Sequence, residues 1–224
     1  MIPGLPMYLN ILFIGTTLLS VFIFYKAASR SNTTLLLLFA WLGIQATVAY
    51  TGFYKITTGF PPRFALLAAP ALLFIILLFV TGKGKKYLDG LDAKTLTLLH
   101  VVRIPVELCL YGLFLNKAVP EVMTFAGRNF DILAGITAPV IYYSGYVTNR
   151  IGKTGLVAWN IACLCLLFNI VITAVLSAPT SFQQFGFDQP NTAILYFPFV
   201  WLPCCVVPLV LLAHLACLRK LLIK

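Results

Sequence analysis

Long apolar runs, separated by short stretches rich in charge, proline or glycine, follow one another along the chain. They fall at residues 8–25, 33–53, 64–82, 95–116, 120–147, 154–178 and 192–218. Each run approaches or exceeds the roughly 20 residues with which an α-helix crosses the hydrocarbon core of a bilayer. The connections between the runs are too short to hold a folded domain. The pattern therefore predicts an all-α integral membrane protein, in which residues 1–224 form one seven-transmembrane-helix bundle.

The composition agrees with this prediction through the classes of protein that it excludes. Of the 224 residues, 61% are hydrophobic and only 10% are charged, whereas about a quarter of the residues of an ordinary soluble domain are charged. A surface so poor in charge cannot face water, which excludes a soluble enzyme and a disordered chain. The six cysteines lie inside apolar runs, where we expect reduced thiols. We expect a multi-pass protein of a plasma membrane or a bacterial inner membrane, with the lipid bilayer as a partner.

Most of the positive charges lie at the ends of the apolar runs. The net charge of +10 therefore indicates membrane topology and contact with anionic lipid, and no nucleic-acid partner is predicted. With the N-terminus outside, the inner connections and the C-terminal tail carry Lys26, Arg30, Lys83, Lys85, Lys86, Lys94, Arg150, Lys153, Arg219, Lys220 and Lys224, and the outer connections carry Lys55, Arg63 and Lys117. Because cytoplasmic loops are rich in Lys and Arg, we predict that the N-terminus is outside and the C-terminus is cytoplasmic.

The fourth run, 95–116, contains ionisable residues at helical spacing. His100, Arg103 and Glu107 are three and four positions apart, and Tyr111 continues the same face. An Arg or an acid that faces lipid in the middle of a span costs about 2.5–3.5 kcal/mol or more. We therefore expect this face to point into the bundle.

The fifth run, 120–147, supplies the expected partners. A helix that begins at Pro120 carries Arg128 and Asp131 about 12–17 Å along its axis, toward the middle of the bilayer. A short turn to the fourth run then places Glu107 beside Arg128, and Arg103 beside Asp131. The sequence predicts a buried, electrically neutral network of these four charges. A network that only fixes the register of the two helices is the structural alternative.

Further polar residues occur at similar depths in other runs. Gln45 and Asn169 are expected in the middle to outer half of the bundle, and Asn160 in the inner half. Asn160 and Asn169 are nine positions apart, so they lie on opposite sides of their helix. A single amide within a span most often bonds to a neighbouring helix.

The two histidines, His100 and His214, lie on different runs at matched depth in the inner half. Such a pair could hold a b-type haem, or a metal ion together with Glu107. No metal-binding motif accompanies them, so hydrogen bonding to Arg103 and Asn160 is the favoured interpretation and no cofactor is predicted.

Three prolines interrupt the seventh run, 192–218. Each removes a backbone donor and frees the carbonyl about four residues earlier. The prolines are Pro198, Pro203 and Pro208, and the freed carbonyls belong to Ile194, Phe199 and Cys204. We expect a kinked helix whose free carbonyls contact protein or a wet cavity.

These features favour a membrane protein that binds a small or amphipathic ligand between the fourth and fifth spans, as a carrier or a receptor does. The expected ligand-binding residues are Arg103, Glu107, Arg128, Asp131, Tyr111, Gln45 and Asn169. In this hypothesis the two arginines hold an anionic or carbonyl group, and the two acids orient them. An intramembrane enzyme, metal-dependent or with an acid or His100 moving a proton, is a second hypothesis. A structural membrane scaffold is a third.

Overall fold

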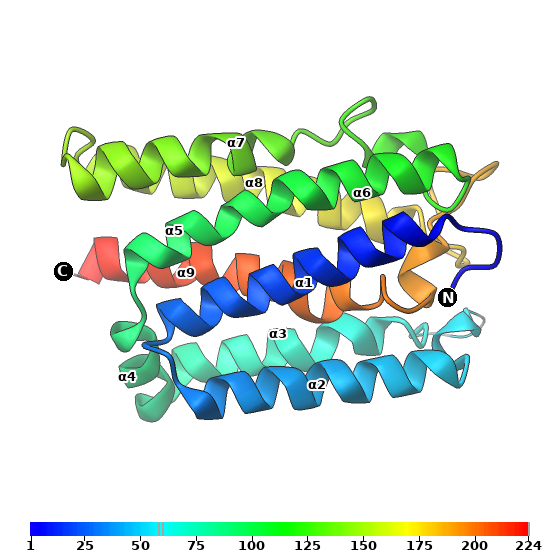
Figure 1. Ribbon diagram of the computed structural model, residues 1–224, viewed down its shortest axis with the longest axis horizontal. Coiled ribbons are helices and arrows are strands. Elements are labelled where there is room, and N and C mark those ends of the chain that lie inside the picture. The colour runs from blue at the N-terminus through cyan, green and yellow to red at the C-terminus, as the bar shows by residue number, and fades with distance from the viewer. Residues whose placement is uncertain (58, 60, 224) are drawn as a thin grey trace.

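A computed structural model of the chain describes residues 1–57, 59 and 61–223. The described residues form an all-helical bundle, and Lys224, assigned above to the inner tail, lies outside them. The helices are α1 (Met7–Ala27), α2 (Asn32–Tyr50), α3 (Ala65–Val80), α4 (Gly82–Gly90), α5 (Ala93–Leu99), α6 (Arg103–Leu115), α7 (Ile132–Ile141), α8 (Lys153–Leu176) and α9 (Val207–Ile223). Figure 1 shows the long helices side by side along one axis, with the two chain termini at opposite ends of the bundle.

The predicted class, a helical bundle with spans suited to a membrane, agrees with the structure. Among the described residues, five helices are long and apolar enough to cross a bilayer: Met7–Ala27, Asn32–Tyr50, Ala93–Leu115, Lys153–Leu176 and Leu202–Ile223. Helices α3 and α4 meet at a bend of 94° and form a sixth span if they are taken together. The remaining apolar helix, Ile132–Val147, is shorter. The number of seven crossings and the orientation stay predictions.

The fourth predicted run is one continuous helical segment with a local change of winding. A 3₁₀ turn, His100–Val102, connects α5 to α6. Pro105 has no N–H to offer the carbonyl of Val101, and the N–H of Arg103 donates to the carbonyls of His100 and Val101 instead. The turn therefore keeps the backbone satisfied at the point where the ionisable residues begin.

The helix predicted to begin at Pro120 does not form, and this expectation is wrong. Pro120 has an extended backbone, a short 3₁₀ turn covers Glu121–Met123, and α7 begins only at Ile132. The chain folds back on itself at Gly127, where a Cβ atom would lie 2.4 Å from the carbonyl oxygen of Glu121. Backbone hydrogen bonds close this compact segment, residues 120–131, without an α-helix.

The seventh run also begins its long helix later than predicted. A 3₁₀ turn covers Ala193–Leu195, and the continuous helix starts with a π-helical segment, Leu202–Val206, that leads into α9. Two of the carbonyls freed by proline have partners: the N–H of Leu202 donates to Phe199 over 3.0 Å, and the indole Nε1 of Trp41 donates to Cys204 over 2.9 Å. The expected contact of free carbonyls with protein is confirmed at these two positions.

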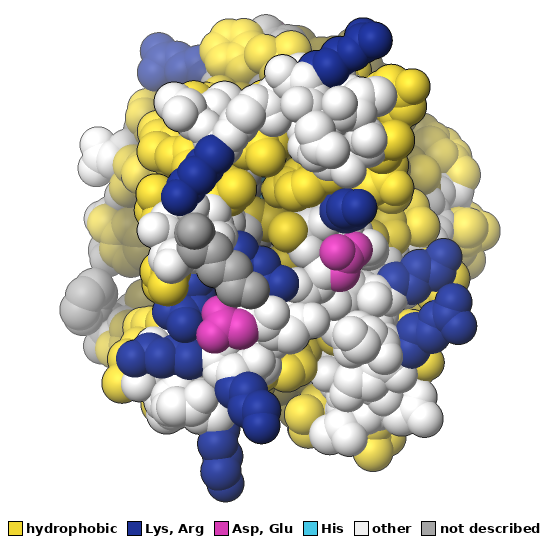
Figure 2. Space-filling view, turned by 90° about the vertical axis from the view of Figure 1, so that its left-hand side faces the viewer, with side chains coloured by type: hydrophobic (Ala, Val, Ile, Leu, Met, Phe, Trp, Pro, Cys, Tyr) yellow, Lys and Arg dark blue, Asp and Glu magenta, His cyan; other side chains and the backbone are white. Residues whose placement is uncertain are grey.

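One end of the bundle is strongly basic. Figure 2 shows Lys and Arg side chains spread over the end where α4 and the C-terminus lie, with two acidic patches among them. Arg219 forms an ion pair with Asp89 there, with 3.1 Å between Nε and Oδ1. Asp92 caps α5; its partial burial opposes ionisation, but hydrogen bonds from Thr95 hold the pKa of Asp92 below its ordinary value. The observed clustering matches the charge pattern from which the orientation is predicted.

Helices α6 and α7 pack closely because α7 has small residues on the shared face. A Cβ atom on Gly135 would lie 2.9 Å from Cγ1 of Ile104, 3.1 Å from its backbone nitrogen and 3.3 Å from Cβ of Arg103. Ala134 and Ala138 are also buried on this helix. Close approach of the two helices therefore depends on the absence of a side chain at Gly135.

We expect Gly135→Val to separate α6 from α7 and to destabilise the protein. Overpacking of a close contact costs roughly 1–3 kcal/mol, which corresponds to a melting temperature lower by roughly 2–12 °C for a chain of this size. Gly15→Val in α1 is the matched control, since nothing lies within 4 Å of a Cβ atom there. Thermal unfolding in detergent measures both variants, and equal losses of stability would contradict the proposed role of Gly135.

Candidate functional site

A buried cluster of polar side chains surrounds Arg103 at the start of α6. Its Nη1 atom lies 2.8 Å from Oδ1 of Asp131, and both side chains are less than a tenth exposed. Nη1 also donates to the backbone carbonyl of Cys163 on α8 over 3.4 Å, and Nη2 lies 2.9 Å from Nε2 of His214 on α9. Arg103 thus connects α6, α7, α8 and α9, and the predicted pairing of Arg103 with Asp131 is confirmed.

The contacts of His214 define its protonation. Because a guanidinium only donates hydrogen bonds, Nε2 of His214 accepts from Arg103 and carries no proton. Nδ1 then donates to Oδ1 of Asn160 over 2.9 Å, while the amide nitrogen of Asn160 donates to the carbonyl of Leu156. His214 is therefore a neutral imidazole with both ring nitrogens bonded to protein.

His100 lies against His214 as an aromatic neighbour. The two rings stack with centroids 3.8 Å apart and 16° between their planes, and Trp159 packs edge-on against His100 at 5.5 Å. His100 is fully buried, and neither of its ring nitrogens has a hydrogen-bond partner among the described residues. The expected hydrogen bonding to Arg103 and Asn160 is confirmed for His214. For His100 it is wrong, because this ring stacks on His214 and bonds to neither residue.

Glu107 lies one turn further along α6 and has a neutral partner. Nδ2 of Asn129 donates to its Oε1 over 2.5 Å, and Oε2 has no partner among the described residues. Asn129 also donates to the carbonyl of Met123, and its Oδ1 accepts from the backbone N–H of Asp131 over 3.0 Å. The amide of Asn129 thus holds the compact segment 120–131 against α6.

Arg128 is not part of the buried cluster, and the expected pairing of Arg128 with Glu107 is wrong. Its side chain is exposed, and the guanidinium lies 5.9 Å from the centre of the Phe185 ring. The physical reason is the absence of a helix at residues 120–131, which changes the direction of every side chain in this segment. The backbone carbonyl of Arg128 accepts a hydrogen bond from Asn169 over 2.9 Å.

Three further residues expected at the ligand lie apart from Arg103. Asn169 is exposed on α8, on the side opposite the buried Asn160, as their spacing predicts. Gln45 is buried and accepts a hydrogen bond from the hydroxyl of Tyr54 over 2.6 Å. Tyr111 stacks on Phe125, with ring centroids 4.8 Å apart. The contacts of these three side chains are thus with groups other than Arg103 and Asp131.

The histidines are not arranged as metal or haem ligands. Both ring nitrogens of His214 are bonded to Arg103 and Asn160, and the face of its ring is covered by His100. Within the described part of the chain, no group of three or more His, Cys, Asp or Glu side chains could hold a metal ion. The set of His100, His214 and Glu107 therefore does not fit a metal, and the stacked pair leaves no room for a haem between the rings.

Asn129 is the member of the cluster that the sequence analysis missed. In a helix that begins at Pro120, Asn129 would point away from the face that carries Arg128 and Asp131, and so away from Glu107. The signal was present, since Gly127 and Asn129 are typical turn residues and together favour a break in the helix. Recognising that break would have brought Asn129 into consideration as a partner of the buried carboxyl group.

A separate cavity of about 560 Å³ lies between α2, α3 and α9. Most of its wall is apolar and includes Leu37, Phe74 and Leu212, and the two cysteines of the π-helical segment also line it. Four hydroxyl groups are grouped near the basic end: Ser31, Thr33, Thr34 and Tyr87. The hydroxyl groups of Thr34 and Tyr87 lie 3.1 Å apart and connect α2 to α4. None of the expected ligand-binding residues lines this cavity.

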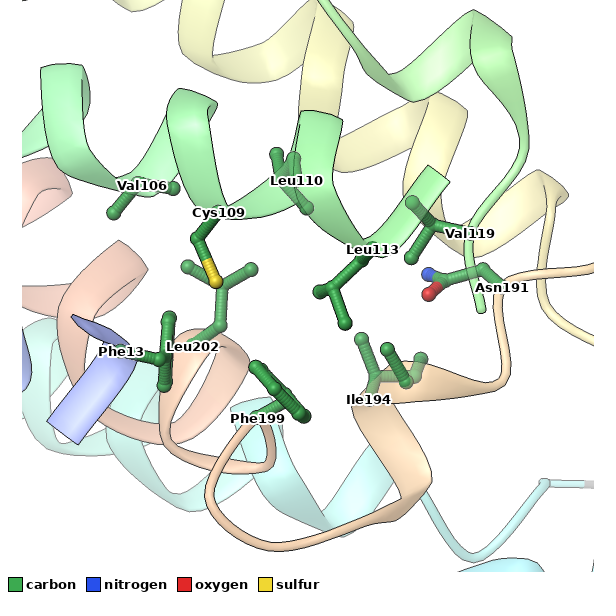
Figure 3. Close-up of a pocket in the computed structure, with 11 residues that line it drawn as sticks. Phe13, Val106, Cys109, Leu110, Leu113, Val119, Asn191, Ile194, Phe199 and Leu202 are labelled. Atoms are coloured by element: carbon green, nitrogen blue, oxygen red, sulfur yellow. The ribbon is translucent and has the colours of Figure 1, made fainter. Parts of the chain in front are cut away.

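A much smaller void, of about 10 Å³, lies between α6 and the turn before α9. Figure 3 shows Cys109, Leu113 and Phe199 around it, with Asn191 at one edge. Its volume is about that of one water molecule, and its wall is almost entirely apolar, so it has too few polar partners to bind a ligand. It is a packing defect in the apolar core, and no residue of the polar cluster lines it.

Comparison with known proteins places the chain in a sequence family but gives it no activity. The family described as Domain of unknown function (DUF8737) matches residues 60–222. No curated protein and no solved structure matches the chain. The matched range covers α3 to α9 and contains the whole polar cluster around Arg103.

We expect Arg103→Met and Asp131→Leu to be strongly destabilising when made singly, by ~3–5 kcal/mol, because each leaves a buried charge without its partner. The double variant should recover much of the loss, since it buries neither charge. Arg128→Met is the matched control, because this side chain is exposed, and it should leave thermal stability close to that of the unchanged protein. A loss for Arg128→Met as large as that for Arg103→Met would show that Arg128 belongs to the network after all.

Proposed function

The chain belongs to the DUF8737 family, and from its own residues we propose that it is a membrane protein that binds one amphipathic molecule with an acyl tail and an anionic head. The observation that carries this proposal is the cavity between α2, α3 and α9. Its volume of about 560 Å³ falls within the roughly 300–1,000 Å³ of typical ligand pockets. The proposed ligand is amphipathic, as the sequence predicts. It binds between α2, α3 and α9, however, and not between the fourth and fifth predicted spans.

The wall of the cavity suits the tail of such a molecule. Apolar side chains from three helices line most of it, including Pro70 of α3 and Pro208 of α9. Burial of an apolar chain against such a surface is favourable by roughly 25 cal/mol for each Å² removed from water. The tail would lie along the helices, parallel to the lipid tails of the bilayer.

The basic end of the cavity suits an anionic head. The hydroxyl groups of Ser31, Thr33, Thr34 and Tyr87 can donate hydrogen bonds to a carboxylate or phosphate. Lys83 is one turn before Tyr87 on the same face of α4, and Arg30 directly precedes Ser31. In the proposal, these two cations complement a negative head group bound at the hydroxyl groups.

Two indole hydrogen bonds hold the walls of the cavity together. Trp41 on α2 donates to the carbonyl of Cys204 over 2.9 Å, and Trp201 donates to the carbonyl of Leu42 over 3.0 Å. Each carbonyl thus accepts from an indole N–H on the opposite side of the interface between α2 and the start of α9. Two walls of the cavity, α2 and the start of α9, are thus braced against each other.

The membrane orientation belongs to the same proposal. The basic end of the bundle faces the cytoplasm, which places the N-terminus outside and gives seven crossings when α3 with α4 and Ile132–Val147 each count as one. The anionic head then lies at the cytoplasmic surface, in a plasma membrane or a bacterial inner membrane. In this arrangement the Arg103–Asp131 pair holds the helices together, apart from the ligand.

We expect Ala71→Phe to fill part of the cavity and to reduce binding of a fatty acid at least tenfold, with the fold intact. Ala162→Phe is the matched control, because this alanine is exposed on α8, away from the cavity. The affinity for a fluorescent single-chain fatty acid, measured in detergent, and native mass spectrometry of the purified protein report the effect. Equal binding by wild type and Ala71→Phe would defeat the proposed cavity function.

The charge of the head can be tested with the same assay. A long-chain alcohol with the same tail lacks the negative charge, so wild type should prefer the acid. Lys83→Gln and Arg30→Gln should each reduce this preference by roughly fivefold, since one cation near a membrane surface contributes about 1 kcal/mol to the binding of an anionic group. Lys153→Gln is the control, because it lies at the start of α8, a helix that contributes no residue to the cavity lining. A preference unchanged in both variants would contradict the anionic head.

A further inference from the structure

The ionic balance of the polar cluster is the starting point of a separate inference, independent of the cavity. Among the described residues, the buried basic side chain is Arg103 and the buried acidic side chains are Glu107 and Asp131. His214 is neutral, because its Nε2 accepts from Arg103. His100 has no hydrogen-bond acceptor within the described part of the chain to stabilise a charge. With both carboxyl groups ionised, the cluster would carry one excess negative charge.

The surroundings decide which carboxyl group keeps its charge. Asp131 lies 2.8 Å from the guanidinium of Arg103 and at the N-terminal end of α7, where the helix dipole favours a negative group. Glu107 has neither advantage. Its nearest donor is the neutral amide of Asn129, and Asn129 in turn is bonded to the backbone of Asp131. Asp131 is therefore the ionised member of the pair.

The environment of Glu107 disfavours a second negative charge in the cluster. Its side chain is 1% exposed, its Oε2 has no partner among the described residues, and no Lys is among the buried side chains. The charged groups that act on it are Arg103, from its own helix, and Asp131, from the segment before α7. Arg103 is already neutralised by Asp131. An isolated carboxylate in such a place costs far more free energy than a neutral carboxylic acid, whose unmade hydrogen bond costs roughly 1–3 kcal/mol.

We propose that Glu107 is a proton-binding site, whose carboxyl group holds one proton at neutral pH and so makes the buried cluster electrically neutral. The ligand is a proton from water. Its release would convert the carboxylic acid into a carboxylate and return one proton to the solvent, leaving one uncompensated negative charge inside the bundle. A group in this state is an acid, so Glu107 does not serve as the general base of the enzyme hypothesis.

The sequence permits a direct measurement. The chain contains two glutamates, Glu107 and Glu121, and Glu121 is exposed in the 3₁₀ turn before α7. Protein labelled with ¹³C at the glutamate side-chain carboxyl and reconstituted in a bilayer therefore gives two carboxyl signals in solid-state NMR. At pH 7 we expect one signal of a protonated acid and one of a carboxylate.

Glu121→Gln should remove the carboxylate signal and keep the protonated signal, which assigns the protonated one to Glu107 without changing the buried site. Glu107→Gln should remove the protonated signal, and its infrared spectrum should lose the C=O band of a carboxylic acid. Two carboxylate signals in the wild-type protein at pH 7 would overturn the proposal. That result would leave the cavity function untouched, because fatty-acid binding is measured separately.

Discussion

An arginine inside an apolar bundle imposes the arrangement of the groups around it. Its charge cannot be removed at neutral pH, so the protein must supply acceptors on several sides of one planar group. Arg103 obtains them from Asp131, from the imidazole of His214 and from a backbone carbonyl of α8. Four helical elements meet because α6 carries Arg103 and each of the other three, α7, α8 and α9, provides one of these contacts. Behind these groups, Asn160 bonds to His214 and Asn129 bonds to the backbone of Asp131.

The path of the chain before α7 is a consequence of this ion pair. Asp131 reaches Arg103 from the first position before the helix, and Gly135, one turn later, allows the two backbones to approach. The preceding residues fold into a compact segment instead of extending the helix toward Pro120. Asn129 can then bond to Glu107, and Arg128 turns outward to Phe185. One strong contact thus separates neighbouring residues into buried and exposed groups.

Sequence periodicity predicted the features that depend on burial along a single helix. The apolar runs, the inward face of His100, Arg103 and Glu107, and the opposite placement of Asn160 and Asn169 all follow from helical spacing. The features it missed depend on contacts across the bundle. Asn129 enters the site because a helix fails to form, and the cavity beside Trp41 arises from the spacing of three helices, which no local pattern records. The local sequence pattern therefore predicts the helices better than it predicts the contacts between them.

The short apolar helix Ile132–Val147 has a consequence for the lipid around it. At about 1.5 Å per residue it is about 24 Å long, less than the roughly 30 Å of hydrocarbon in a typical bilayer. The compact segment before it exposes the aromatic rings of Phe125 and Phe130. Because irregular chain is not tolerated against hydrocarbon, a bilayer around this helix would have to thin locally by several ångström, so that residues 120–131 lie at the level of the lipid head groups.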